Sequence, residues 1–114
     1  MAYFTTDQNQ GSTIVRFVFS EIGFKEREEL KNELSSLLKE GDNKYIFNLS
    51  HVGFLSSLVI ATMVFFSKEA RGRGGEVKLC ELTPEAQQVC QITRLDAVFD
   101  IYDTETEAIS SFAS

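Results

Sequence analysis

The order of strands and helices is the feature of this sequence that most narrows its fold. After an opening pair of strands, short runs with strand character alternate with longer segments of helical periodicity. The order ββαβαβαβα predicts an α/β protein: a mixed sheet of about four to five strands with helices packed on it. A chain of 114 residues is expected to form one domain, residues 1–114. We predict strands over residues 2–6, 13–19, 44–50, 76–82 and 97–102, and helices over residues 24–43, 57–70, 83–93 and 104–113.

The opening strands and the first helix follow from hydrophobic periodicity. The polar segment 7–12 is the expected turn between the two strands, and Phe17 and Phe19 share one strand face because side chains alternate there. Segment 24–43 is expected to be a helix with Gly41 as its C-cap. Four leucines form its apolar stripe at helical spacing, namely Leu30, Leu34, Leu37 and Leu38.

The helix predicted over residues 57–70 is apolar on nearly every side before Lys68, so it should be the most buried helix. The segment "RGRGG", residues 71–75, is expected to end this helix and turn the chain. A phosphate-binding glycine loop requires the opposite order, because the helix that follows such a loop must point its N-terminus at the anion.

Two later helices carry capping signals at their starts. Thr83 is a preferred N-cap residue, and Pro84 follows it at the first helical position. Thr104 and Glu107 have the spacing of a capping box. These signals predict where both helices begin.

Charge and composition argue for a cytoplasmic protein. The net charge is −6, and Arg71 and Arg73 form only a small basic spot, so a nucleic-acid partner is not expected. The start "MAYFTTDQNQ" has no secretory signal pattern. The longest apolar run, Leu58 to Phe66, is interrupted by Thr62 and is too short to insert across a bilayer.

The common catalytic patterns are missing, so we expect no enzymatic activity and no cofactor. Neither Ser56 nor Ser57 has the flanking glycines of a nucleophile elbow. His51 is the only histidine and is expected to be a solvated polar residue. Cys80 and Cys90 lack metal-ligand spacing and are expected to be free, buried, apolar side chains, with no metal site.

The two serines between a strand and the apolar helix have two interpretations. Serine is a preferred N-cap residue, which gives Ser56 a purely structural role. The alternative is that this pair of serines carries the function of the protein. Leu55 and Leu58 likewise have two interpretations: they are buried under the sheet edge, or they join Phe54 in an apolar surface for a partner.

The sequence resembles the STAS family, the sulfate-transporter and anti-sigma-factor-antagonist domain. Two segments carry the resemblance, "YIFNLSHVGFLSSLVIATM" and "RGGEVKLCELTPEAQQVCQITRLDAVFDIYDTETEA". They follow the family order of a strand, a serine loop opening an apolar helix, a Gly-Gly turn, a strand and a Thr-Pro helix. A Leu-Asp-x-x-Phe segment and a Glu-Ala helix come next. The resemblance covers nearly the whole chain and implies the STAS fold.

The resemblance implies a regulatory module that binds other proteins. In bacterial anti-sigma factor antagonists, a kinase-type anti-sigma factor (a GHKL-type serine kinase) phosphorylates the serine of this loop, and a PP2C-type phosphatase removes the phosphate. The aligned serine is Ser56, with Ser57 as the fallback. The expected partner-binding residues are Gly53, Phe54, Leu55, Ser56, Ser57 and Leu58.

Departures from the family pattern leave other functions open. Leu55 and Leu58 occupy the Asp and Gly positions of the serine loop, and Arg94 replaces a common glycine. The second hypothesis is therefore an accessory or scaffold STAS protein of a signalling assembly or membrane transporter that works without phosphorylation. The third is a small enzyme or nucleotide binder with a pocket beside His51 and Ser56.

Overall fold

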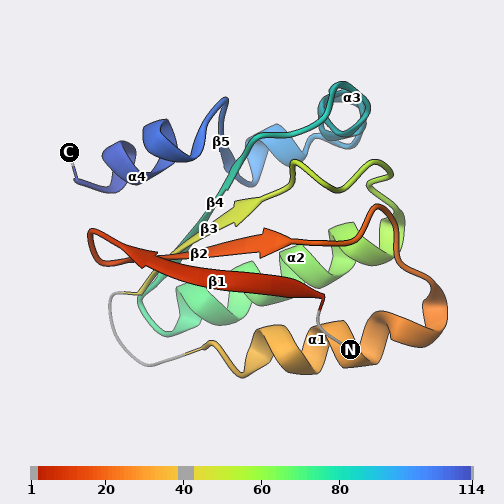
Figure 1. Ribbon diagram of the computed structural model, residues 1–114, viewed down its shortest axis with the longest axis horizontal. Coiled ribbons are helices and arrows are strands. Elements are labelled where there is room, and N and C mark those ends of the chain that lie inside the picture. Colours follow the sequence, from red (N-terminus) through yellow and green to blue (C-terminus); the bar gives the residue numbers. More distant parts are fainter. Residues whose placement is uncertain (1–2, 39–42, 114) are drawn as a thin grey trace.

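The computed structural model describes residues 3–38 and 43–113 and places all of their strands in one five-stranded sheet (Figure 1). The strand order is β1-β2-β3-β4-β5, with β1 antiparallel to β2 and the other neighbours parallel. The predicted α/β class and element order are confirmed. The elements are β1 (Phe4–Asn9), β2 (Ser12–Phe17), the short helix η1 (Phe24–Glu26), α1 (Arg27–Ser35), β3 (Lys44–Asn48), α2 (Ser57–Gly72), β4 (Glu76–Cys80), α3 (Pro84–Thr93), the short helix η2 (Leu95–Ala97), β5 (Asp100–Tyr102) and α4 (Glu105–Ala113).

The opening hairpin is longer than the sequence predicted, and its turn is shorter. The predicted turn over residues 7–12 is wrong, because β1 continues to Asn9 and β2 begins at Ser12. Gln10 and Gly11 alone make the turn, with φ of 52° and 82°. Two positive φ values match the twist of the flanking strands in a two-residue hairpin. The polar residues of β1 are exposed at the sheet edge, so that strand lacks the hydrophobic pattern used for prediction.

Helix α1 ends earlier than the predicted helix over residues 24–43. The helix ends at Ser35 with Ser36 as its C-cap, and the predicted cap at Gly41 lies outside the described residues. The Ser36 hydroxyl donates a hydrogen bond to the Glu33 carbonyl oxygen, and the next backbone bonds tighten to a three-residue spacing. These bonds use carbonyl oxygens that a longer helix would need for its own hydrogen bonds, so the helix ends here. Leu30 and Leu34 are buried on the core.

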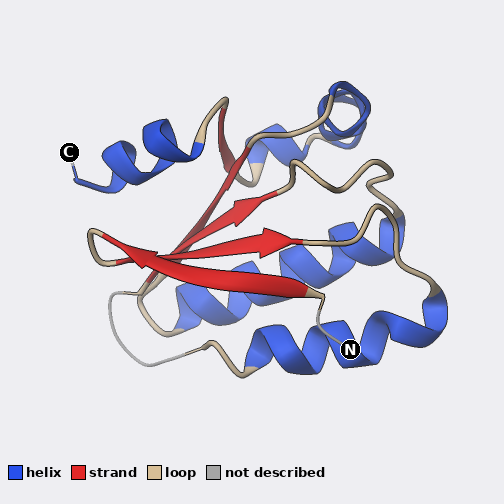
Figure 2. Ribbon diagram, in the orientation of Figure 1, coloured by secondary structure: helices blue, strands red, loops and turns tan. Residues whose placement is uncertain are grey.

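The main core lies between one face of the sheet and helices α1, α2 and α3. Figure 2 shows α1 and α2 together on one side of the sheet and α4 on the other. Phe17 and Phe47 project from β2 and β3 with ring centroids 5.3 Å apart, and Phe47 lies 5.3 Å from the Phe66 ring of α2. Edge-to-face and tilted ring pairs of this kind add to the stabilisation from burial. The sheet therefore positions α2 through aromatic contacts.

Helix α2 buries more residues than any other described helix, but one of its sides is exposed. Its buried stripe runs from Val59 to Ala70 at helical spacing. Ala61 is exposed, and 38% of the Phe65 side chain is accessible to solvent. The segment "RGRGG" ends the helix as predicted, with Gly74 at φ 87°.

Helix α4 packs on the second face of the sheet (Figure 2). Ala108 and Ile109 pack on Ile14, Ile46 and Cys80 in a small second core. At the far end of α4, the buried Lys78 ammonium donates a hydrogen bond to Ser111 Oγ over 2.7 Å, and this ammonium lies 4.1 Å from the centroid of the Phe112 ring. These contacts hold α4 along its length.

Both cysteines are buried and free. Burial, together with the nearby Glu105 and Glu81 carboxylates, raises the pKa of the Cys80 thiol to about 12. Burial also raises the pKa of the Cys90 thiol. High pKa values leave little reactive thiolate at neutral pH, which fits the predicted apolar role of both side chains.

Replacing Arg94 with glycine is expected to raise the free energy of unfolding by about 0.5–1 kcal/mol. Arg94 has φ 62° and ends α3 in the left-handed conformation, which costs a residue with a β-carbon about 1–2 kcal/mol. Glycine removes this cost but gains more freedom in the unfolded chain. Urea denaturation measures the change. Thr93→Gly, one position earlier and helical, should instead destabilise by about 1 kcal/mol, and equal effects of both changes would contradict the explanation.

Candidate functional site

The predicted site lies in the loop between β3 and α2, at the carboxyl edge of the parallel strands. Ser20, which follows β2, accepts a backbone hydrogen bond from Phe54 N–H over 3.1 Å. Thr83, which follows β4, donates its hydroxyl to the Val52 carbonyl oxygen over 3.3 Å. The loop is therefore fixed between two neighbouring loops. In open parallel sheets, this edge is where binding sites usually form.

Some side chains of this loop are buried in the core, and the side chains between them face outward. Leu49, Val52, Leu55 and Val59 are all at most 2% exposed and belong to the main core. Leu55 is thus buried under the sheet edge, which decides between the two interpretations of this residue. Its side chain anchors the loop and does not belong to the surface.

The residues between these anchors face outward. Phe54 is 57% exposed, although phenylalanine is usually buried. Ser57 is exposed, and Gly53, Ser56 and Leu58 are half-buried. A β-carbon on Gly53 would come within 2.9 Å of Ser20 Oγ, so the lack of a side chain allows the two loops to approach. We call the exposed and half-buried residues Gly53, Phe54, Ser56, Ser57 and Leu58 the loop surface.

Ser56 is the N-cap of α2. Its Oγ accepts a hydrogen bond from Val59 N–H over 3.3 Å, and its φ and ψ of −74° and 164° are extended. The structural interpretation of Ser56 is therefore confirmed. The same geometry places the hydroxyl oxygen at the positive end of a 16-residue helix, where N–H groups and the helix dipole favour an anion.

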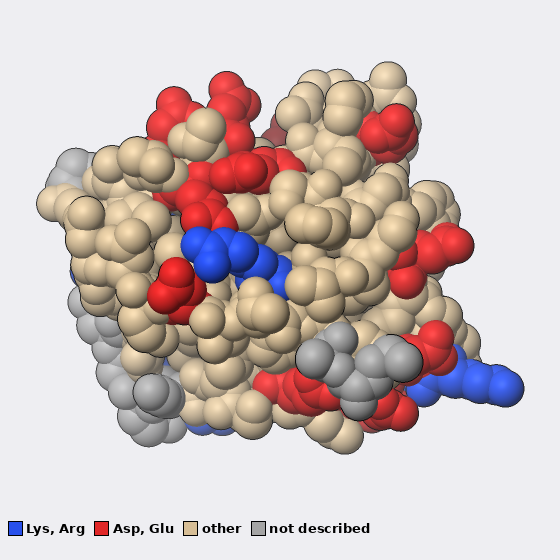
Figure 3. Space-filling model, viewed as in Figure 1, with Lys and Arg blue, Asp and Glu red and all other residues tan. Residues whose placement is uncertain are grey.

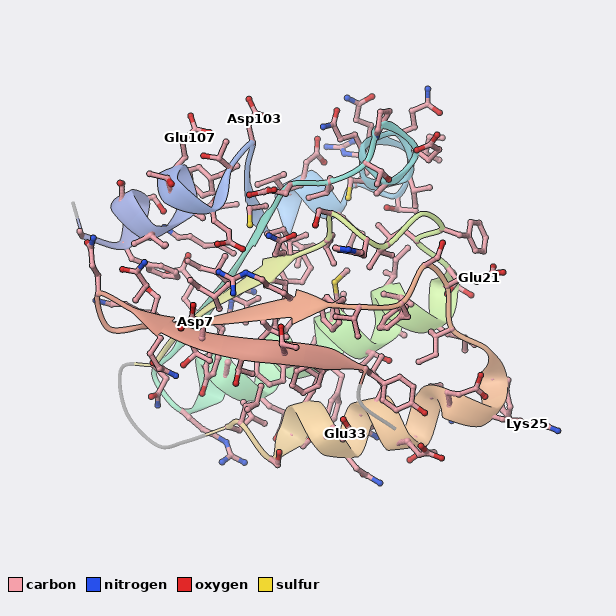
Figure 4. All side chains as sticks on the ribbon, in the orientation of Figure 1. Asp7, Glu21, Lys25, Glu33, Asp103 and Glu107 are labelled. Carbon is pink, nitrogen blue, oxygen red and sulfur yellow. The ribbon has the colours of Figure 1, made fainter. Side chains whose placement is uncertain are left out.

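The polar side chains beside the loop surface are exposed to solvent. His51 is exposed, and its Nδ1 lies 3.3 Å from the hydroxyl oxygen of its neighbour Ser50. Glu21 is exposed on the loop that follows β2 and projects toward solvent beside this edge (Figure 4). Two cavities beside β5 and a groove between α1 and α2 are lined by residues other than His51 and Ser56.

A polar network that the sequence analysis missed supports the start of the loop from the second sheet face. The Arg16 guanidinium binds the Glu105 carboxylate through two hydrogen bonds of 2.7 and 2.9 Å. Asn48 donates its amide to the same carboxylate and accepts a hydrogen bond from Ser50 N–H over 2.9 Å. Glu81 accepts the Glu105 N–H over 3.1 Å. The network joins β2, β3 and α4 with Glu81, the residue that follows β4. No local pattern reveals it, because Arg16 and Glu105 are 89 positions apart.

Replacing Glu105 with glutamine is expected to lower the free energy of unfolding by about 2 kcal/mol at neutral pH, because a charged acceptor of several bonds is lost. The hydrogen bond from Arg16 lowers the Glu105 pKa below its ordinary 4.5. A carboxylate with a depressed folded pKa stabilises above its unfolded pKa, and this contribution disappears as the pH falls through the folded value.

The difference between the native chain and Glu105→Gln should therefore shrink as the pH falls below 4.5, as measured by urea denaturation across that range. Asp103→Asn removes an exposed carboxylate next to α4, which Figure 4 shows pointing away from the sheet, and should change stability by less than about 0.5 kcal/mol. A pH-independent difference for Glu105→Gln would contradict the role of its charge.

Within residues 3–38 and 43–113, no three His, Cys, Asp or Glu side chains are grouped as metal ligands. Across the same residues, every helix is too short or too polar to cross a membrane.

Comparison with known proteins identifies relatives of the whole fold. The STAS domain family model matches residues 3–108. A putative anti-sigma factor antagonist, BtrV of Bordetella bronchiseptica, is 26% identical over 85 residues, which cover 75% of this chain and 73% of BtrV. A STAS domain protein of Planctomyces limnophilus superposes with a TM-score of 0.88 at 26% identity, covering 99% of this chain and all of that one. The phosphorylated form of the Bacillus cell fate determinant SpoIIAA shares the fold with a TM-score of 0.69 at 21% identity, covering 96% and 98% of the two chains.

Proposed function

Because the chain belongs to the STAS domain family, we propose that it is a non-catalytic cytoplasmic regulator that binds a kinase-type anti-sigma factor through the loop surface. The single observation that carries this proposal is the exposure of Phe54 beside the N-terminus of α2. The putative antagonist BtrV, similar over most of both chains, supports the class of partner.

Phe54 has the properties of an interface anchor. Its ring is 57% exposed, while its backbone N–H is fixed by Ser20 and the neighbouring Leu55 is held in the core. A large apolar group on a rigid backbone loses little conformational freedom when it enters a partner's pocket. Half-buried Leu58 extends the apolar contact, and the polar Ser57 is available for a hydrogen bond at its edge.

Phosphorylation of Ser56 by the partner kinase would switch this surface. A phosphate adds about −1.5 to −2 charges at the helix start, where backbone N–H groups and the helix dipole accommodate it. The domain therefore keeps its fold, while an apolar or acidic partner surface is repelled. A PP2C-type phosphatase restores the hydroxyl. The Bacillus SpoIIAA, which shares the fold, is known in a phosphorylated form.

The test incubates the purified chain with ATP and the GHKL-type anti-sigma kinase of its own cell, and then measures intact mass and maps the modified peptide. We expect one phosphate on Ser56 in the native chain and none in Ser56→Ala. Ser57→Ala is the matched control and should still accept phosphate. Phosphate that persists in Ser56→Ala and disappears in Ser57→Ala would move the switch to Ser57, and an unmodified native chain would reject the switch.

The second candidate is an accessory STAS protein that binds its partner permanently. Leu55 in place of the family's Asp favours this candidate, because its buried side chain offers a kinase no carboxylate beside Ser56. If this candidate is correct, the partner should bind Ser56→Glu as tightly as it binds the native chain. A large loss of binding by Ser56→Glu, with Ser56→Gln unaffected, would favour the switch.

A further inference from the structure

The groove between α1 and α2 carries chemistry that the proposed function does not use. We propose that this groove is a second docking site, which binds an acidic amphipathic helical segment of another protein. The lining residues are Arg27, Lys31, Ala61, Thr62 and Phe65. These residues belong to α1 and α2, the two helices that Figure 1 shows side by side below the sheet.

Exposed apolar groups form the α2 side of the groove. Ala61 and Phe65 are four positions apart, so they lie on one helix face in successive turns. Ala61 is exposed and Phe65 is 38% exposed. Thr62 is buried at the base, where its hydroxyl donates a hydrogen bond to the Leu58 carbonyl oxygen over 2.8 Å. This side can receive an apolar side chain without exposing an unsatisfied hydroxyl.

Cations held against aromatic rings form the α1 side. The Lys31 ammonium lies 4.4 Å from the Phe65 ring centroid, and the Arg27 guanidinium lies 5.2 Å from the ring centroid of the exposed Phe24. Arg27 also contacts Glu28 over 3.1 Å, but both side chains are well exposed, at 40% and 60%. Exposed ion pairs contribute little, so an incoming carboxylate can take the place of Glu28.

The charge of the groove differs from that of the chain. The chain has 17 acidic and 11 basic residues, whereas the five lining residues include two cations and no carboxylate. Acidic side chains lie outside this lining, over α4 and along α1, on the face drawn in Figure 3. A local positive site on an acidic protein selects a ligand with a few well-placed carboxylates, and a densely anionic surface would be repelled by the rest of the chain.

The spacing of the cations determines the form of the ligand. Arg27 and Lys31 are four positions apart, which places them about 5–6 Å apart along one face of α1. Two glutamates four positions apart on a ligand helix have the same spacing and can meet both cations. An adjoining row of leucines on that helix would then contact Ala61 and Phe65. Helix-in-groove recognition of this kind depends on side chains one turn apart.

The test uses a labelled synthetic helical peptide of about 15 residues with one Glu pair four positions apart beside a leucine row, read by fluorescence anisotropy. An isomer of the same composition carries the two glutamates two positions apart, and a third peptide carries glutamine at both positions. We expect the first peptide to bind about tenfold more tightly than either of the others, because only it meets both cations.

Charge reversal in the protein supplies the matched comparison. Arg27→Glu and Lys31→Glu should each weaken binding about tenfold or more, and Phe65→Ala should weaken it as well. Lys25→Glu changes the net charge by the same amount, but Figure 4 shows Lys25 projecting away from the two helices, so binding should remain within about twofold. The neutral variants Arg27→Gln and Lys31→Gln repeat the comparison if a reversed charge disturbs folding.

Several outcomes would overturn the proposal: no saturable binding of the first peptide, equal binding of its isomer, or equal weakening by Lys25→Glu and Lys31→Glu. Binding of phosphatidylglycerol vesicles through Arg27 and Lys31 without peptide binding would instead assign the groove to a membrane surface and would also overturn it. The Phe54→Ala variant should bind the peptide as the native chain does, so the result is separate from the test of the loop surface.

Discussion

Replacing Phe54 with alanine is expected to weaken binding of the proposed anti-sigma factor partner by about 30-fold or more, without unfolding the protein. The reason is that a large exposed ring on a fixed backbone becomes a central contact when a partner covers it, and such residues cost about 2 kcal/mol or more when truncated. The ring is 57% exposed in the unbound chain, so its removal leaves no cavity in the core. Titration calorimetry with the purified anti-sigma factor measures the dissociation constant.

Two variants make this result specific. Phe54→Tyr keeps the ring and should retain most of the affinity. Ile92→Ala removes a side chain that is 80% exposed near the C-terminal end of α3 and is not part of the loop surface, so it should leave binding within about twofold. If Phe54→Ala binds as tightly as the native chain, or Ile92→Ala loses as much affinity, the loop surface is not the binding site.

Replacing Phe47 with alanine is expected to lower the free energy of unfolding by about 4 kcal/mol, because it opens a cavity that the surrounding rings cannot fill. Phe47 is fully buried, and its ring lies 5.3 Å from the Phe17 ring and 5.3 Å from the Phe66 ring. Removing the Phe47 ring therefore removes the aromatic contacts that join β3 to β2 and to α2. Such a loss is a large fraction of the roughly 5–15 kcal/mol that stabilises a domain.

Urea denaturation of Phe47→Ala and Phe54→Ala forms a matched pair, because the same ring is removed only seven positions away. The Phe54→Ala change should cost less than about 1 kcal/mol of stability, since its ring is mainly in solvent. Comparable losses in both variants would mean that Phe54 is part of the core. A loss below about 1.5 kcal/mol for Phe47→Ala would mean that the aromatic contacts do not hold α2 on the sheet.

The features that could be predicted from sequence are those determined by nearby residues. The caps Ser56 and Thr83 and the Thr104–Glu107 capping box depend on groups within three positions, and each forms as predicted. The element order depends on hydrophobic periodicity, which the sheet and helices preserve. The predicted strand over residues 2–6 missed the second half of β1, because the residues there are polar. A strand at the edge of a sheet can be polar, so hydrophobic periodicity does not reveal it.

Features that depend on distant contacts could not be predicted. Leu55 and Phe54 are adjacent apolar residues, and only the packing of the loop on the sheet buries one and exposes the other. The bonds from Arg16 and Asn48 to Glu105 join strands to the last helix and have no sequence signature. The positive φ of Arg94 departs from what its residue type favours, and the resemblance alone marked the position as one where glycine is common.

The central claim is that partners bind the loop surface at the carboxyl edge of the sheet. Nitrogen-15 chemical-shift mapping of the chain during titration with unlabelled anti-sigma factor tests it most directly. We expect the largest changes at Gly53, Phe54, Ser56, Ser57 and Leu58, with smaller changes at Ser20 and Thr83, which hold the loop. Changes concentrated on α4 and the second sheet face, with the loop surface unaffected, would contradict the claim.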